Sequence, residues 1–73
     1  MNTATFIRLA SDIVQHAPKN DYQGYVENVV EPYRDQAAEY YGVSEFAVVH
    51  YSYLIAASLE TLGCTVIPDN LTN

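Results

Sequence analysis

The sequence has few of the features that usually stabilise or identify a very small protein. Among its 73 residues Cys64 is the only cysteine, so no disulfide can form within the chain. No cluster of cysteine and histidine has the spacing of a metal site. A domain of this size without either device depends on apolar packing alone. A lone cysteine also suits a reducing compartment.

Basic residues are scarce as well. Arg8, Lys19 and Arg34 stand against nine acidic residues, which gives a net charge of −6. Because binding to a phosphate backbone depends on basic side chains, direct specific DNA binding is not expected. The acidity favours a basic protein partner, such as a nucleic-acid enzyme, and it also serves plain solubility.

Long apolar runs are missing. The longest apolar stretch, residues 46–59, is interrupted by His50, Ser52 and Ser58 and is too short to span a bilayer. The chain does not open with a positive segment followed by an apolar run, so no signal peptide is expected. These features predict a protein of the bacterial cytoplasm, or of a host bacterial cytoplasm, with no membrane contact.

Catalytic constellations are missing too. His16 and His50 lie far apart in the sequence, and neither has a paired carboxylate nearby. Cys64 stands in an apolar segment, which favours burial over reactivity. There is no phosphate-binding loop, so we expect neither an enzyme activity nor a cofactor.

What the chain does have is apolar residues, which make up 49% of it, including seven tyrosines between residues 22 and 53. This composition is too apolar for a disordered chain. The spacing of the apolar residues is mostly helical. We therefore expect a single domain over residues 1–73, a mainly α bundle of three to four helices with at most one short C-terminal strand.

The first helix is expected to begin at a cap on Asn2 or Thr3 and to end before Pro18. Its apolar side is expected to carry five residues, and Arg8 and Asp12 lie four apart on its outer side. These apolar residues are Phe6, Ala10, Ile13, Val14 and Ala17. A strand over residues 3–9, which roughly alternate, is the alternative.

Residues 22–41 are expected to form either one kinked helix or two helices. Asp21 caps the first part, over about residues 22–30, whose apolar side is Tyr22, Val26, Val29 and Val30. Pro32 then breaks or kinks the helix, or begins a second one over about residues 32–41.

Gly42 and Ser44 end one helix and cap the next, which is expected over about residues 45–62 and to be capped by Gly63. Val48, Tyr51, Ile55 and Leu59 are expected to face the core. The apolar and β-branched composition of residues 64–68 predicts one extended stretch, and residues 69–73 are expected to be frayed.

Residues 37–54 resemble the helix-turn-helix family. The family places alanine four residues before a turn glycine, then an apolar residue, a Ser or Thr cap and a buried Val or Ile. Ala38, Gly42, Val43, Ser44 and Val48 occupy these positions, and Tyr51 matches a further buried one. The physical reasons hold, because alanine permits close helix approach and glycine adopts the left-handed turn conformation.

The resemblance fails on the face that would read DNA. In the family, outward positions of the second helix touch bases and phosphates. In this chain those positions are Glu45, Phe46, Val49, His50 and Tyr53. Bases are usually read by Arg, Lys, Asn or Gln, and none of these is present. The resemblance therefore implies a helix-turn-helix-like core without the family's DNA binding.

Three sets of residues are candidates for binding a partner, and each has a purely structural alternative. Phe46, Val49, His50 and Tyr53 share one helix face, which is either a docking stripe or part of the core. Glu27, Glu31, Asp35 and Glu39 recur every fourth residue, which would give a row about 18 Å long on a continuous helix. Tyr33, Tyr40 and Arg34 are expected to be exposed near this row.

The overall character of the chain resembles small bacteriophage proteins that bind and regulate host RNA polymerase. That resemblance implies a non-enzymatic regulator that inhibits initiation or promotes antitermination by binding the polymerase, as a monomer or weak homodimer. An acidic inhibitor of a host defence nuclease is an alternative, and so is a homodimeric helix-turn-helix-like module. The resemblance to these bacteriophage proteins assigns no role to a residue beyond the surface candidates above.

Overall fold

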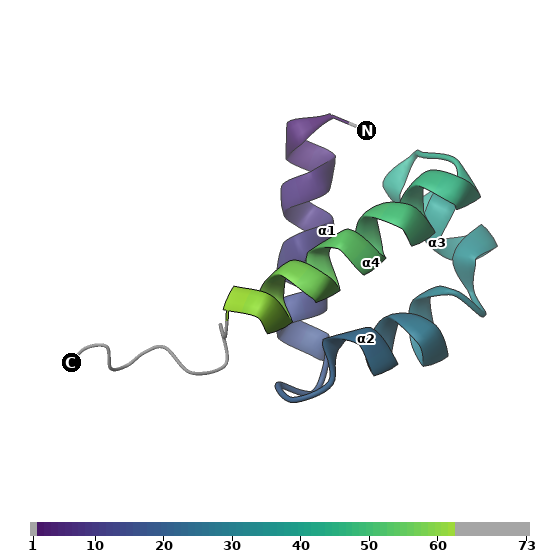
Figure 1. Ribbon diagram of the computed structural model, residues 1–73. Coiled ribbons are helices and arrows are strands. Elements are labelled where there is room, and N and C mark those ends of the chain that lie inside the picture. Colours follow the sequence, from purple (N-terminus) through teal and green to yellow (C-terminus); the bar gives the residue numbers. More distant parts are fainter. Residues whose placement is uncertain (1, 63–73) are drawn as a thin grey trace.

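Four α-helices and one π-helical segment make up most of residues 2–62, the part of the chain that the computed structural model describes (Figure 1). They are α1 (Thr3–His16), α2 (Tyr22–Tyr25), η1 (Val26–Val30), α3 (Arg34–Tyr41) and α4 (Glu45–Leu62). The long helix α4 crosses α1 obliquely and contacts every other helical element. The predicted mainly α class and small helical bundle are confirmed.

The first helix forms as its caps predict. The side chain of Asn2 accepts a hydrogen bond from the Thr5 amide at 2.8 Å, so α1 and not a strand occupies residues 3–16. The Ala17 amide donates to the Ile13 carbonyl at 2.9 Å before Pro18 ends the helix. The core-facing row is Leu9, Ile13 and Ala17, spaced four apart.

Val14 was expected on the apolar side of α1, and this expectation is wrong, because the side chain is exposed. Val14 lies one position past Ile13, and each helical step turns the side chain by about 100°. Leu9, which the pattern did not select, is buried in the core instead.

The second helical segment runs without a break from α2 into η1. The carboxylate of Asp21 accepts a hydrogen bond from the Gly24 amide at 3.0 Å, as expected of a cap. The Glu31 amide then donates to the Val26 carbonyl, five residues back, at 2.8 Å, which is the π-helical pattern. The segment ends there because Pro32 has no N–H to donate.

The start predicted for the next helix, at about residue 32, is wrong by two residues, because α3 begins at Arg34. Pro32 lies in the turn, which is closed by hydrogen bonds from Tyr33 to Val30 at 3.2 Å and from Arg34 to Glu31 at 3.3 Å. Residues 22–41 therefore form two helical segments. Val29, expected in the core, is exposed. The buried residues of this segment are spaced four apart, at Tyr22, Val26 and Val30, and Val29 lies outside that row.

The connection between α3 and α4 has the expected local structure. Gly42 has φ of 71°, in the left-handed region that favours glycine, and the Val43 amide donates to the Ala38 carbonyl at 3.0 Å. The hydroxyl of Ser44 accepts a hydrogen bond from the Ala47 amide at 3.0 Å and caps α4. Ala38 and Val48 are buried on either side of this turn.

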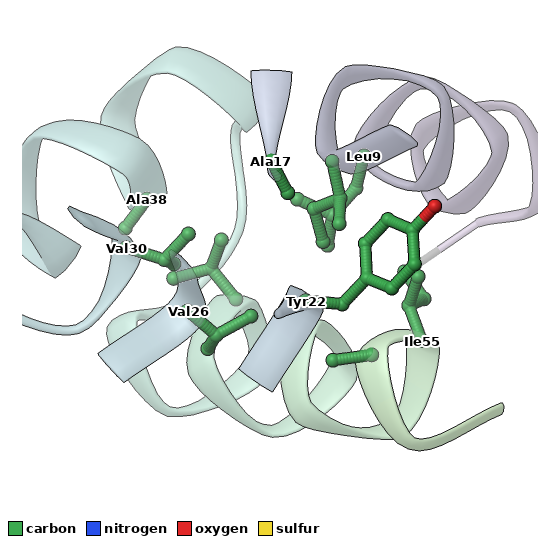
Figure 2. Packing of buried hydrophobic residues seen from close by; sticks show 10 residues of the cluster. Leu9, Ala17, Tyr22, Val26, Val30, Ala38 and Ile55 are labelled. Atoms are coloured by element: carbon green, nitrogen blue, oxygen red, sulfur yellow. The ribbon is translucent and has the colours of Figure 1, made fainter. Parts of the chain in front are cut away.

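The core brings together side chains from all five helical elements (Figure 2). From α4 the buried residues are Val48, Ser52, Ile55 and Ala56, and the half-buried Tyr51 and Leu59 pack against this core. The prediction that Val48, Tyr51, Ile55 and Leu59 face the core is confirmed. The Ser52 hydroxyl is fully buried and has no hydrogen-bond partner within residues 2–62. The predicted cap at Gly63, the extended segment 64–68 and the frayed end 69–73 lie outside the described residues.

Candidate functional site

A groove lined by tyrosine lies between α1, α3 and the α2–η1 segment. We call it the tyrosine groove and define it by Asp12, Tyr25, Tyr33, Tyr40 and Tyr41. Its apolar floor includes Leu9, Ile13 and Val30, which belong to the core, and its volume is about 240 Å³. The helix α1, the α2–η1 segment and α3 therefore share one small aromatic depression.

Asp12 is the charged residue of this groove. Its half-buried carboxylate accepts a hydrogen bond from the Tyr41 hydroxyl, which joins α1 to α3. Burial and this hydrogen bond both raise the pKa of Tyr41 well above its usual value. Burial, and then the nearby charge of Asp12, also raise the pKa of Tyr25. Because their pKa values are raised, both tyrosines keep their hydroxyl protons to a higher pH than a free tyrosine does.

Arg8 contacts two tyrosines of the groove, Tyr40 and Tyr41. Its guanidinium carbon lies 5.1 Å from the ring centre of Tyr40 and 5.4 Å from that of Tyr41. The two rings meet edge to face, with centres 4.8 Å apart. The sequence placed Arg8 and Asp12 on the outer side of α1. Arg8 is exposed, as expected, whereas Asp12 is half-buried, and both contact tyrosines of α3.

A second surface lies where α4 begins. We call it the Phe46 patch, and it consists of Glu31, Arg34, Glu45, Phe46 and Val49. Phe46 is 78% exposed and its ring stacks on that of His50, with centres 5.5 Å apart. Arg34 approaches Glu45 at 3.4 Å and donates to the Glu31 carbonyl at 3.0 Å.

The predicted docking stripe on α4 is thus divided by its surroundings. Phe46 and His50 are exposed, whereas Val49 and Tyr53 are half-buried. The Tyr53 hydroxyl donates to the Glu31 carboxylate at 2.7 Å. This hydrogen bond, and then partial burial, raise the pKa of Tyr53 to about 12. Tyr53 and Glu31 therefore hold the fold together and offer less to a partner than Phe46 does.

The four acids that recur every fourth residue do not form one row on one helix. Glu27 is on η1, Glu31 is in the turn at Pro32, and Asp35 and Glu39 are on α3. Glu27, Asp35 and Glu39 are exposed, and Glu31 is half-buried. The continuous helix that a straight row requires is interrupted, because the chain turns at residues 31–33.

Of the predicted surface residues, the structure brings Tyr33 and Tyr40 together in the tyrosine groove and Glu31, Arg34, Phe46 and Val49 together in the Phe46 patch. Sequence reasoning missed the contributions of Asp12, Tyr25 and Tyr41 to the groove. A signal existed for Asp12, because a carboxylate three residues after Leu9 stands directly beside the buried row of α1.

Within residues 2–62 no group of three or more His, Cys, Asp and Glu side chains is placed to hold a metal ion. The same part of the chain has no helix long and apolar enough to cross a membrane. In comparisons with protein-family models, curated proteins and solved structures, no match to this chain was found.

Proposed function

We propose that this chain is a non-enzymatic, acidic regulator that acts by binding a basic protein, and that bacterial RNA polymerase is the first partner to test. The observation that carries the proposal is a set of exposed aromatic side chains on α3, on α4 and at the residue before α3, together with exposed carboxylates on the same two helices. Tyr33, Tyr40 and Phe46 are 57%, 66% and 78% exposed.

Exposed aromatic residues of this kind are typical of protein-binding surfaces. Tyrosine and phenylalanine are enriched at the centres of interfaces, and truncation of such residues often costs much of the binding energy. Asp35 and Glu39 are exposed acids on α3, the helix that carries Tyr40, and the exposed Glu45 lies beside Phe46. Together with the net charge of −6, they attract a basic surface and accelerate its association.

The mechanism that fits is competition. A basic, nucleic-acid-facing part of the polymerase binds the acidic and aromatic surface of this protein in place of σ factor or of the RNA path. Competition at either place would change transcription without any catalysis by this protein. Competition with σ factor would inhibit initiation, and competition with the RNA path would act during elongation and promote antitermination.

Transcription with purified bacterial RNA polymerase tests the proposal directly. Two reactions are compared with and without the protein: promoter-dependent initiation, and elongation from preassembled complexes through a terminator. Phe46→Ala and Tyr40→Ala are expected to weaken the effect, and Ile7→Ala is the control because Ile7 is also an exposed apolar residue, on α1. If neither reaction responds to the wild-type protein, the polymerase proposal is wrong.

A nuclease assay run beside the transcription assay, with one charge-reversal variant in both, separates this function from a nuclease inhibitor. Glu39→Lys suits the purpose, because Glu39 is exposed and its carboxylate takes part in none of the hydrogen bonds of residues 2–62. Glu31→Lys is unsuitable, because it also breaks the bond to Tyr53. Inhibition of a defence nuclease by wild type, lost in Glu39→Lys and at high salt, with transcription unchanged, would move the function to that class.

A further inference from the structure

Asp12 is the one charged residue that lines the tyrosine groove, and its charge is not neutralised by an ion pair within residues 2–62. It accepts a hydrogen bond from the Tyr41 hydroxyl, whereas a carboxylate offers about four acceptor positions. The ion pair found within residues 2–62 joins Arg34 to Glu45, in the Phe46 patch. A half-buried carboxylate with free acceptor positions therefore faces an aromatic groove.

The tyrosine rings already bind a guanidinium. Arg8 lies over the rings of Tyr40 and Tyr41, within the distance at which a cation is attracted by an aromatic face. It makes this contact in preference to an ion pair with Asp12, one helical turn away. The groove thus combines the two groups that recognise arginine, aromatic faces and a carboxylate, and leaves the carboxylate unpaired.

The size of the groove suits one side chain. Pockets for drug-sized ligands span about 300–1,000 Å³, and this groove measures about 240 Å³. Its floor of Leu9, Ile13 and Val30 is apolar, as the methylene stem of a long cationic side chain requires. The net charge of −6 draws a cation towards it and repels nucleic-acid phosphates.

We infer that the tyrosine groove binds an arginine side chain from an exposed segment of a partner protein, with the guanidinium against the tyrosine rings and donating to Asp12. Arginine fits better than lysine, because its planar group stacks on aromatic faces and gives two parallel hydrogen bonds to a carboxylate. This inference rests on the proposed protein-binding function and names the chemistry that the partner presents.

The test is a titration of the ¹⁵N-labelled protein with a short blocked peptide, glycine-serine-arginine-serine-glycine, followed by amide chemical shifts. The control peptides replace arginine by lysine or by citrulline, which has the same shape without the charge. The expected result is saturable shifts at Asp12, Tyr33 and Tyr41 with the arginine peptide, weaker binding of lysine and none of citrulline. Equal shifts with citrulline, or no saturable shifts, would overturn the inference.

Two variants of equal charge distinguish the groove from general attraction. Asp12→Asn keeps an acceptor for the Tyr41 hydroxyl and removes the charge, and it is expected to weaken arginine binding about tenfold. Glu39→Gln removes one exposed charge outside the groove and is expected to change binding less than about twofold. Equal losses in the two variants would mean that the groove has no specific role.

Arg8 supplies a test of opposite sign. Arg8→Gln frees the faces of Tyr40 and Tyr41 and removes a like charge, so it is expected to strengthen binding of the arginine peptide. Lys19→Gln makes the same change of charge in the exposed turn after α1 and is expected to have a smaller effect. If Asp12→Asn does not fold, Tyr33→Leu serves instead, because Tyr33 is largely exposed, and its failure to weaken binding would contradict the inference.

The peptide titration tests the arginine site and the transcription assay tests the polymerase proposal, so a negative result in one leaves the other hypothesis standing. If the peptide does not bind and transcription still responds, the protein-binding function stands and the arginine site is lost. If the arginine peptide binds as expected and the polymerase is unaffected, the site stands and the partner is another protein that presents arginine.

Discussion

The hydroxyl of Tyr53, in the middle of α4, donates a hydrogen bond of 2.7 Å to the carboxylate of Glu31, the residue before Pro32. The bond joins α4, the longest helix, to the turn between η1 and α3. It therefore fixes the position of a turn whose backbone is held by hydrogen bonds of 3.2 and 3.3 Å.

This hydrogen bond predicts a loss of stability at high pH. An unfolded tyrosine releases its proton near its usual pKa of 10.0, whereas Tyr53 in the fold holds it to about 12. The contribution is therefore complete below pH 10 and is lost as the pH rises towards 12. The raised pKa values of Tyr41 and Tyr25 act with the same sign.

Urea unfolding at a series of pH values checks this prediction. We expect the free energy of unfolding of the wild type to fall steadily above pH 10. That of Tyr53→Phe is expected to fall less steeply, because one of the three tyrosines with a raised pKa is absent. A free energy of unfolding that rises above pH 10 would contradict the assignment of Tyr53 as the donor.

Asp21 and Gly24 are predicted to be coupled. A methyl group on Gly24 would lie 2.0 Å from a carboxylate oxygen of Asp21, the side chain that caps α2. Gly24→Ala therefore gains about 1 kcal/mol of helix propensity and displaces a cap worth about 1 kcal/mol. In the wild type these effects nearly cancel, whereas in an Asp21→Ala background Gly24→Ala is expected to stabilise by about 1 kcal/mol.

A double-mutant cycle measured by thermal or urea unfolding decides this point. The cycle compares the two single variants with the double variant, and its interaction term is expected to be clearly different from zero. Simple additivity of the two substitutions would show that the cap and the glycine do not affect one another.

Two isoleucines of α1 give a matched test of the core. Ile13 is 1% exposed and Ile7 is 59% exposed, so the same substitution removes a buried side chain in one case and a surface side chain in the other. Ile13→Ala is expected to cost about 2–5 kcal/mol, which approaches the whole stability of a small domain. Ile7→Ala is expected to cost about 0.5 kcal/mol. Circular dichroism during urea unfolding measures both, and similar losses would mean that the orientation of α1 is wrong.

Ser52 is predicted to tolerate loss of its hydroxyl. The group is fully buried and has no hydrogen-bond partner within residues 2–62, so its desolvation is not compensated there. Ser52→Ala is expected to leave stability unchanged or raise it by about 1 kcal/mol. A loss of more than about 1 kcal/mol in urea unfolding would show that the hydroxyl does have a partner in solution.

The helices were predictable because their limits depend on local chemistry. Asn2, Asp21 and Ser44 each accept the hydrogen bond expected of a cap, and Gly42 adopts the expected left-handed conformation. Which side of α1 faces the core was less predictable, because α1 carries apolar residues on several sides. The choice of Leu9 over Val14 depends on where α4 packs.

The tyrosine groove was beyond sequence reasoning for a related reason. It needs residues from three helical elements, and their meeting depends on the angle of the turn at Pro32. The π-helical pattern in η1 shifts the residues that follow it by one position relative to an α-helix, and no local signal in residues 26–30 indicates that change. Tyr33 and Tyr40 were predicted as exposed residues, but their place in one groove with Asp12 could not be.

The place of α4 in the chain bears on how the protein folds as it is made. This helix contacts α1, α2, η1 and α3, and it is the last of them to be synthesised. Until residues 45–62 have left the ribosome, Leu9, Ile13 and Val26 lack the surface that covers them. Residues 1–44 therefore emerge as a chain with uncovered apolar groups, and the core is completed only after α4 has been made.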